Sequence, residues 1–309
     1  MITPDLRRRW SGIHVTMVTP FTSTYALDEI RLRKVVDNLI ADGVDAINHP
    51  LTTGEGSALT LEEHKTVVSI VADQVAGRVP YLAGVARTST RESVELARHA
   101  TAAGADGIIG LSPYYLQLNQ AEMYRHFHDL ASSVDTPLVI YNHPPITKSS
   151  MSADTALRLS ALPNVVGFFP TNLDLGQLLD YSLTLRGELL LLAGREEILP
   201  VAGSLGFEAQ STSCFHFVPN LVSSIWSASQ KGEVGTALEL FSALEAWRKL
   251  VRRKTEAGHF GAFAAYTKAS MRYCGVDAGF LRPPLTEISP DEMSELERVL
   301  DANLGCIRR

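Results

Sequence analysis

Short apolar segments recur along the chain, and segments with helical periodicity lie between them. The eight apolar segments cover residues 13–18, 46–48, 80–85, 107–111, 138–142, 165–169, 189–193 and 209–212. Continuous apolar runs of this length are typical of strands that are buried on both faces of a parallel sheet. Eight alternating strand and helix units predict an α/β fold of the (β/α)8 TIM barrel type, and an open doubly wound sheet is the alternative.

Helix boundaries are visible between these strands. Residues 32–40 place apolar side chains on one face, and Gly43 follows where a left-handed C-cap residue is expected. Three other helix starts have the spacing of a capping box: Thr60 with Glu63, Ser89 with Glu92, and Asn119 with Glu122. No glycine-rich nucleotide-binding fingerprint follows the first strand, which disfavours the open sheet.

After the eighth strand the chain continues as helices. Apolar positions over residues 234–251 and 266–273 predict two of them, and Ser289-Pro290-Asp291-Glu292 has the cap, proline and acids of a third helix start. No linker composition separates these helices from the barrel. We therefore expect a barrel over residues 1–230 and a C-terminal helical extension, residues 231–309, packed on it.

Composition narrows the function classes. The 309 residues are 45% hydrophobic, which is enough for a large core, and 28 basic against 34 acidic residues give a net charge of −6. Without a basic stripe or an acidic tail, neither nucleic acid nor a membrane surface is an expected partner. Three scattered cysteines indicate neither a disulfide framework nor a CxxC metal site, and no cofactor is expected. No apolar run is long enough to span a bilayer or to form a signal-peptide core after Arg7-Arg8-Arg9, so the expected location is the cytoplasm.

The ends of the fifth and sixth strands differ in chemistry. Active sites of TIM barrels lie at the carboxyl ends of the strands. The fifth strand ends in Tyr141-Asn142-His143-Pro144, which brings a phenol, an amide and an imidazole to that end. The sixth strand ends in Phe169 and Pro170 and carries no polar side chain there.

Three ordered motifs at strand ends carry a family resemblance: Thr52-Thr53-Gly54-Glu55, Ser112-Pro113-Tyr114-Tyr115 and Tyr141-Asn142-His143-Pro144. The opening Val18-Thr19-Pro20-Phe21 and the late Leu281-Arg282-Pro283-Pro284-Leu285 extend it over nearly the whole chain. Together they resemble the dihydrodipicolinate synthase and N-acetylneuraminate lyase family of class I aldolases and lyases.

The resemblance implies an aldol, retro-aldol or dehydration reaction on a 2-oxo acid, usually pyruvate. Tyr141 would relay protons, supported by Thr52 or Thr53, with Gly54 in the same substrate-binding loop and Tyr115 reaching in from a neighbouring subunit. A phenol with an ordinary pKa near ~10 needs such partners to exchange protons at neutral pH. A homo-oligomer follows from the role of Tyr115, either a dimer or the homotetramer.

The sequence departs from the family at the reacting group. The family's nucleophile is a lysine that ends the sixth strand in a pattern similar to Val-Gly-Ile-Lys, and here Phe169 stands in its place. A Schiff base requires a primary amine, which a phenyl ring lacks. Lys148, in the loop after the fifth strand, is the one replacement amine considered. The other six lysines fall in helices or at their ends, where solvated charges are expected.

Other departures concern the binding of the acid. Synthases of the family usually have an arginine where Ile146 stands, which argues against the lysine-biosynthetic reaction. Arg195 follows the seventh strand and Glu208 belongs to the strand-eight segment, so the two form either a structural ion pair or a functional pair. In the functional interpretation Arg195 binds an acidic ligand, Phe169 lines the pocket and Glu208 is a general base. His49, His143 and Glu208 also allow a metal site as an alternative, and hydrogen-bonded histidines are the plainer interpretation.

The sequence therefore predicts a diverged lyase or aldolase-type enzyme for a small 2-oxo or hydroxy acid, without a Schiff base at the usual position. A non-catalytic ligand-binding or regulatory barrel is the first alternative. An ordinary family lyase that uses Lys148 is the second.

Overall fold

The computed structural model is described here for residues 2–172, 174–256 and 261–304. Eight parallel strands form a closed barrel, because β1 pairs with both β2 and β8, as the alignment of Val15 with Ile47 and with Thr212 illustrates. The strands are β1 Gly12–Thr16, β2 Ala46–His49, β3 Tyr81–Gly84, β4 Gly107–Leu111, β5 Leu138–Asn142, β6 Val165–Pro170, β7 Leu190–Ala193 and β8 Ala209–Thr212. The predicted TIM barrel is confirmed, with strand ends that differ from the expected ones by no more than two residues.

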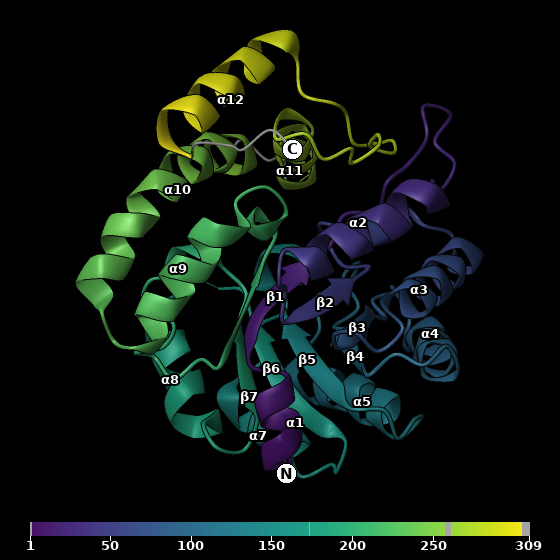
Figure 1. The fold of residues 1–309 in the computed structure, drawn as a ribbon. Coiled ribbons are helices and arrows are strands. Elements are labelled where there is room, and N and C mark those ends of the chain that lie inside the picture. Colours follow the sequence, from purple (N-terminus) through teal and green to yellow (C-terminus); the bar gives the residue numbers. More distant parts are fainter. Residues whose placement is uncertain (1, 173, 257–260, 305–309) are drawn as a thin grey trace.

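Helices surround the barrel and cover its outer face (Figure 1). They are α1 Pro4–Arg9, α2 Glu29–Ala41, α3 Leu61–Val75, α4 Thr90–Ala102, α5 Gln120–Ala131, α6 Pro144–Thr147, α7 Ala153–Leu159, α8 Leu175–Leu185, α9 Pro219–Gln230, α10 Val234–Glu256, α11 Ala262–Tyr273 and α12 Pro290–Asn303. Short 3₁₀ turns lie at Gly56–Ala58, Glu196–Ile198 and Cys214–His216. No helix in the described ranges is long and apolar enough to cross a membrane.

The predicted caps set several helix ends. Thr60 and Glu63 form a reciprocal capping box at α3, as do Asn119 and Glu122 at α5. At α4, Ser89 accepts from the backbone of Glu92, whose carboxylate instead pairs with Arg87. Gly43 has a φ of +82° just after α2, the conformation expected of a glycine that ends a helix.

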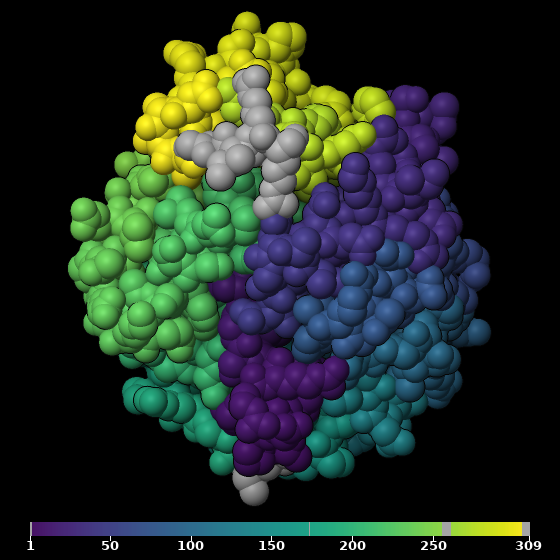
Figure 2. Space-filling view, viewed as in Figure 1, coloured from purple at the N-terminus to yellow at the C-terminus, as the bar shows by residue number. Residues whose placement is uncertain are grey.

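The N-terminal helix α1 closes the amino end of the barrel, opposite the C-terminal helix α12 (Figures 1 and 2). Trp10 follows α1 and is fully buried, and Gly107 leaves room for its ring, because a Cβ atom there would lie 2.3 Å from the indole. Arg7 of α1 binds Glu208 through both carboxylate oxygens at 2.6–2.7 Å. The expectation that Glu208 lies beside Arg195 is therefore wrong. Glu208 precedes β8, and residues that precede a parallel strand lie at the amino end of the barrel.

The C-terminal helices are tied to the loop after β2. The ammonium of Lys268 on α11 donates to Glu55 at 2.6 Å and to the carbonyls of Thr19 and Phe280 at 2.7 Å. The side chains of Lys268 and Glu55 are both 0% exposed. The expectation that Lys268 is a solvated helix lysine is wrong, because its side chain is buried. Three hydrogen-bond acceptors compensate for the burial of its charge.

Candidate active site

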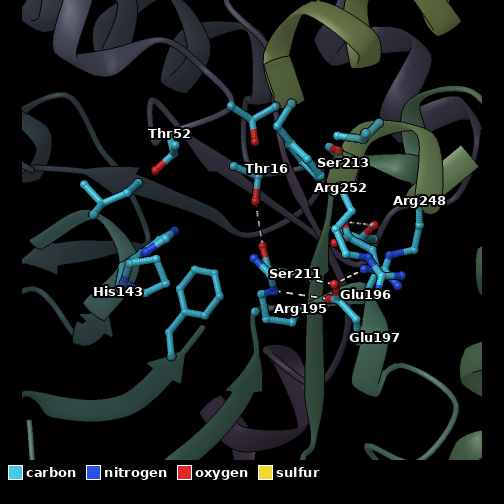
Figure 3. A pocket seen from close by; sticks show the side chains of 18 of the residues that line it. Thr16, Thr52, His143, Arg195, Glu196, Glu197, Ser211, Ser213, Arg248 and Arg252 are labelled. Atoms are coloured by element: carbon cyan, nitrogen blue, oxygen red, sulfur yellow. Dashed lines mark hydrogen bonds and ion pairs between the residues drawn. The ribbon is translucent and has the colours of Figure 1, made fainter. Parts of the chain in front are cut away.

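A cavity of about 490 Å³ opens at the carboxyl ends of the strands (Figure 3). Its walls come from β1, β5, β6, β8, the loops after β2, β5 and β7, and the helices α10 and α11. The lining residues are Thr16, Thr52, Thr53, Tyr141, His143, Pro145, Ile146, Phe169, Gly194, Arg195, Glu196, Glu197, Ser211, Thr212, Ser213, Trp247, Arg248, Val251, Arg252 and Phe263. Five of the eight residues predicted for the site lie on this wall: Tyr141, Thr52, Thr53, Phe169 and Arg195.

Tyr141 lies at the end of β5 with its phenol buried. Burial raises the pKa of Tyr141 well above its usual value, and a hydrogen bond with the side chain of Thr52 opposes this shift. The phenol is therefore protonated at neutral pH, and it is suited to donate a proton rather than to accept one.

The ring of Phe169 stacks on the ring of Tyr141, with centroids 4.3 Å apart and an interplanar angle of 16°. Gly194 leaves room for the Phe169 ring, because a Cβ atom at residue 194 would lie 2.6 Å from that ring and 2.4 Å from the Thr171 methyl group. Two aromatic rings thus form one side of the cavity floor. Offset stacking of this kind adds about 1 kcal/mol beyond the burial of the two side chains.

The loop after β2 presents Thr52 and Thr53 to the cavity. Gly54 is absent from the cavity wall but shapes the loop, since a Cβ atom there would lie 2.9 Å from the carbonyl of Met17 and 3.0 Å from the His49 ring. His49 Nε2 and the Thr19 hydroxyl lie 2.8 Å apart beneath this loop. Gly54 is therefore required for the close packing of the loop on β1 and β2.

Arg195 is part of a network of charges that links the loop after β7 to α10. Its guanidinium donates to Glu197 at 3.0 and 3.1 Å, and Arg248 of α10 binds the same carboxylate. Arg248 also binds Glu245 at 3.0 Å, which Arg252 binds at 2.7 Å. Burial lowers the pKa of Arg248 to about 10, so that it stays charged at neutral pH. The sequence offered no signal for the approach of α10 to this loop.

Glu196 is a cavity residue that the sequence interpretation missed. Its carboxylate is buried and accepts a hydrogen bond of 3.1 Å from the Thr212 hydroxyl. No ion pair among the described residues includes Glu196, and its negative charge contributes to the high pKa of Tyr141. A buried carboxylate and a protonated phenol in one cavity have the chemistry of a base and an acid. Its place after β7, at a strand end, was the signal that could have identified it.

Hydroxyl side chains form the other side of the floor, and they contact a buried amide that does not line the cavity. Thr16 and Ser211 line the cavity, and Figure 3 shows their side chains pointing toward one another. Their hydroxyl oxygens lie 2.7 Å apart. The Asn48 amide lies 3.3 Å from Ser211 and 3.2 Å from His14 Nδ1. The sequence interpretation singled out none of these four residues for function.

Tyr115 lies outside the cavity and is 85% exposed. Its neighbour Tyr114 instead lines a smaller cavity of about 180 Å³ that shares Thr52, Tyr141 and Ile146 with the larger one. A contribution of Tyr115 to the site would need a second copy of the chain, so its catalytic role stays a prediction.

The residues of the considered metal site are not brought together. His143 lines the cavity and His49 contacts Thr19, whereas Glu208 lies at the opposite end of the barrel. Burial lowers the pKa of His143 to about 4, so this ring is neutral at physiological pH. Within the described ranges, no group of three or more His, Cys, Asp or Glu side chains is arranged to hold a metal ion.

The chain is similar in sequence and in structure to proteins of one known family. Residues 9–303 match the sequence model described as the dihydrodipicolinate synthetase family. The 4-hydroxy-tetrahydrodipicolinate synthase of Methanosphaera stadtmanae is 32% identical over 94% of this chain and 98% of its own length. The synthase of Phenylobacterium zucineum is 33% identical over 98% of this chain and all of its own length. YagE, a prophage protein of this family from E. coli K12 whose crystal structure contains pyruvate, superposes with a TM-score of 0.88 and 28% identity, covering 96% of this chain and 99% of its own.

Proposed function

Because the chain belongs to the dihydrodipicolinate synthetase family, we propose that it is a lyase of the aldolase or dehydratase type for a small 2-oxo or hydroxy acid. It would act by proton transfer and without an imine at the end of β6. The observation that carries the proposal is Phe169, which occupies the cavity floor against Tyr141 at the position where the resemblance puts the family's lysine.

No lysine lines the cavity, although all seven lysines of the chain lie within the described ranges. Lys148 is exposed, and its ammonium donates to the carbonyl of Pro145 at 2.8 Å. Lys268 is buried under the loop after β2 and does not line the cavity. Its ammonium donates to Glu55 and to the carbonyls of Thr19 and Phe280. An imine with a substrate in the cavity has no amine to form on, which disfavours the relocated-lysine alternative.

The cavity retains groups for general acid and base catalysis. Tyr141 would donate its proton to a departing or developing oxygen, and Thr52 would orient the phenol. Glu196 would accept a proton from the carbon next to the substrate carboxylate or carbonyl. The guanidiniums of Arg195 and Arg248 would attract the acid, with part of their charge already balanced by Glu197.

Ile146 supports the view that the chain is not an authentic dihydrodipicolinate synthase. It lines the cavity at the position where synthases of the family usually have an arginine. An apolar side chain cannot bind a carboxylate through paired N–H donors. The physiological form would be a cytoplasmic homo-oligomer, a dimer or a tetramer, in which Tyr115 reaches a neighbouring site.

A non-catalytic binding barrel is the second candidate. The mutual neutralisation of Arg195, Arg248, Glu197 and Glu245 favours it, since such a network also serves as a rigid binding wall. Turnover by the wild type that is lost in Tyr141→Phe would favour an enzyme over this alternative.

Borohydride trapping tests the proposal. We expect no adduct when the wild type is treated with pyruvate or 2-oxobutanoate and borohydride, as read by intact mass. Phe169→Lys should gain one adduct that maps to residue 169, and Phe169→Met is the matched control without an amine. An adduct on the wild-type chain would contradict the proposal, and its mapped lysine would become the nucleophile.

A further inference from the structure

A chain of polar side chains crosses the barrel interior from the cavity floor toward α1. Thr16 contacts Ser211 at 2.7 Å, Ser211 contacts Asn48 at 3.3 Å, and Asn48 contacts His14 Nδ1 at 3.2 Å. His14 Nε2 then lies 2.8 Å from the carbonyl oxygen of Trp10. All four side chains are buried, but Thr16 and Ser211 line the cavity, whereas His14 and Asn48 do not. The polar groups of His14 and Asn48 must therefore find their partners within the protein.

The carbonyl of Trp10 fixes the direction of this chain. A carbonyl oxygen only accepts, so His14 Nε2 must carry a proton. Burial lowers the pKa of His14, which keeps the ring neutral at physiological pH. In a neutral ring with a proton on Nε2, Nδ1 has only a lone pair and requires a donor.

Asn48 supplies that donor if its amide NH₂ group faces His14. The amide oxygen and nitrogen exchange places by a half-turn of the side chain, and their positions follow from the hydrogen-bond network. With the nitrogen toward His14, the amide oxygen faces Ser211 and accepts from its hydroxyl. Ser211 then has no proton for Thr16 and must accept the proton of the Thr16 hydroxyl. The hydroxyl protons of Thr16 and Ser211 therefore both point away from the cavity.

We propose that Thr16 is a specificity-determining residue that presents only accepting lone pairs to the cavity, and that the acid bound there carries a hydroxyl group that donates to it. This inference rests on the proposed function, which leaves a 2-oxo and a hydroxy acid as alternatives, and it selects the hydroxy acid. A carbonyl or carboxylate oxygen placed at Thr16 would face another acceptor without a proton between them. The carboxylate belongs on the side of the cavity that holds Arg195 and Arg248, and Ser211, Asn48 and His14 are the positioning residues.

The first test reads the direction of the chain without any ligand. Long-range ¹H–¹⁵N spectra of ¹⁵N-histidine protein report which ring nitrogen is protonated, and His14→Gln assigns the signal. We expect His14 to be neutral with its proton on Nε2 at pH 7.5. A doubly protonated ring, or a proton on Nδ1 alone, would reverse the chain and overturn the proposal.

The second test measures binding by calorimetry for matched acids in which fluorine replaces the hydroxyl group. The pairs are lactate with 2-fluoropropanoate, 3-hydroxypropanoate with 3-fluoropropanoate, and 4-hydroxybutanoate with 4-fluorobutanoate. Fluorine keeps the size of the group but cannot donate. We expect the hydroxy acid of at least one pair to bind the wild type about tenfold more tightly, as one added hydrogen bond allows.

Variants assign the preference to Thr16 and to the chain below it. Thr16→Val should abolish the preference, and Thr16→Ser should restore it. Asn48→Leu should reduce it to a few-fold, because the hydroxyls of Ser211 and Thr16 are then free to rotate. A preference that persists in Thr16→Val would overturn the proposal, as would equal affinities in all pairs or no binding of any of these acids.

Failure of the proposed function has a separate signature. A hydroxy-acid preference that depends on Thr16, in a protein without turnover, supports the acceptor site and assigns the barrel to binding alone. Turnover of 2-oxo acids with no preference in any pair retains the enzyme and overturns the role of Thr16.

Discussion

The barrel interior has two sides of opposite character. Apart from the phenol of Tyr141, the inward residues of β3 to β7 are apolar, and they include these members of one buried cluster: Leu82, Ile109, Leu111, Val139, Val166, Leu190 and Leu192. The inward residues of β8, β1 and β2 include Ser211, Thr16, His14 and Asn48, which are linked by hydrogen bonds. Burial stabilises the apolar side whatever its detailed contacts, whereas the polar side is stable only when every partner is in place. The two sides meet at the cavity floor.

A polar group on the apolar side should have the largest effect. Leu192→Asn buries an amide among hydrocarbon side chains where no partner replaces water, and it removes a fully buried leucine. We expect the free energy of unfolding to fall by about 4 kcal/mol. Urea denaturation measures it, and the volume-conserving Leu192→Met should cost less than about 1.5 kcal/mol. Equal costs for the two variants would contradict the contrast.

Breaking the polar side should have a somewhat smaller effect. Asn48→Leu removes one of the two buried partners of both His14 and Ser211 and should cost about 2 to 3 kcal/mol in the same assay. The double variant His14→Leu with Asn48→Leu removes both members of one contact, so its cost should be clearly below the sum of the single costs. Additive costs would show that the chain does not act as a unit.

The boundary between the two sides has no room for an added methyl group at Gly194. Gly194→Ala places a methyl group against Phe169 and Thr171 and should cost about 2 kcal/mol by forcing these side chains apart. Gly235→Ala in α10 is the matched control, because no atom beyond its chain neighbours and the adjacent helix backbone lies within 4 Å of the added Cβ. The control should be neutral or slightly stabilising, since alanine favours a helix. Thermal unfolding of the two variants decides the point.

Acid should weaken the fold through its buried histidines. Burial lowers the pKa of His143 to about 4 and that of His216 to about 3, against about 6.5 in the unfolded chain. Between pH 6.5 and 4 the unfolded state therefore binds more protons. Stability is present above pH 6.5 and falls as the pH decreases, by up to about 1.4 kcal/mol per pH unit for each histidine.

Urea midpoints at pH 7.5, 6 and 5 measure this slope. His216→Gln should reduce it, because glutamine does not titrate in this range. A slope that is unchanged in His216→Gln would show that the His216 ring is already charged in the folded protein.

The sequence was most informative where local pattern determines structure. Apolar runs located β1 to β8, and the motifs that begin with Thr52 and with Tyr141 located the cavity, because strand ends in a parallel barrel meet at one face. The sequence could not predict that Arg248 lines the cavity, since the approach of α10 to the loop after β7 depends on tertiary packing. Glu208 was misplaced although the predicted strand began at residue 209, which already puts its predecessor at the amino end. Lys268 was misjudged because a helical position alone does not reveal burial.

The bond between Lys268 and Glu55 also imposes an order on the synthesis of the protein. Glu55 binds the ammonium of Lys268, 213 residues later, and the backbone N–H of Arg282, 227 residues later. On the ribosome, all eight strands are made while the carboxylate of Glu55 still lacks both partners. The loop after β2, which carries Thr52 and Thr53, has all of these contacts only after α11 and the segment up to Arg282 have been translated. A chain that stops before residue 268 would therefore contain all eight strands but lack both partners of Glu55.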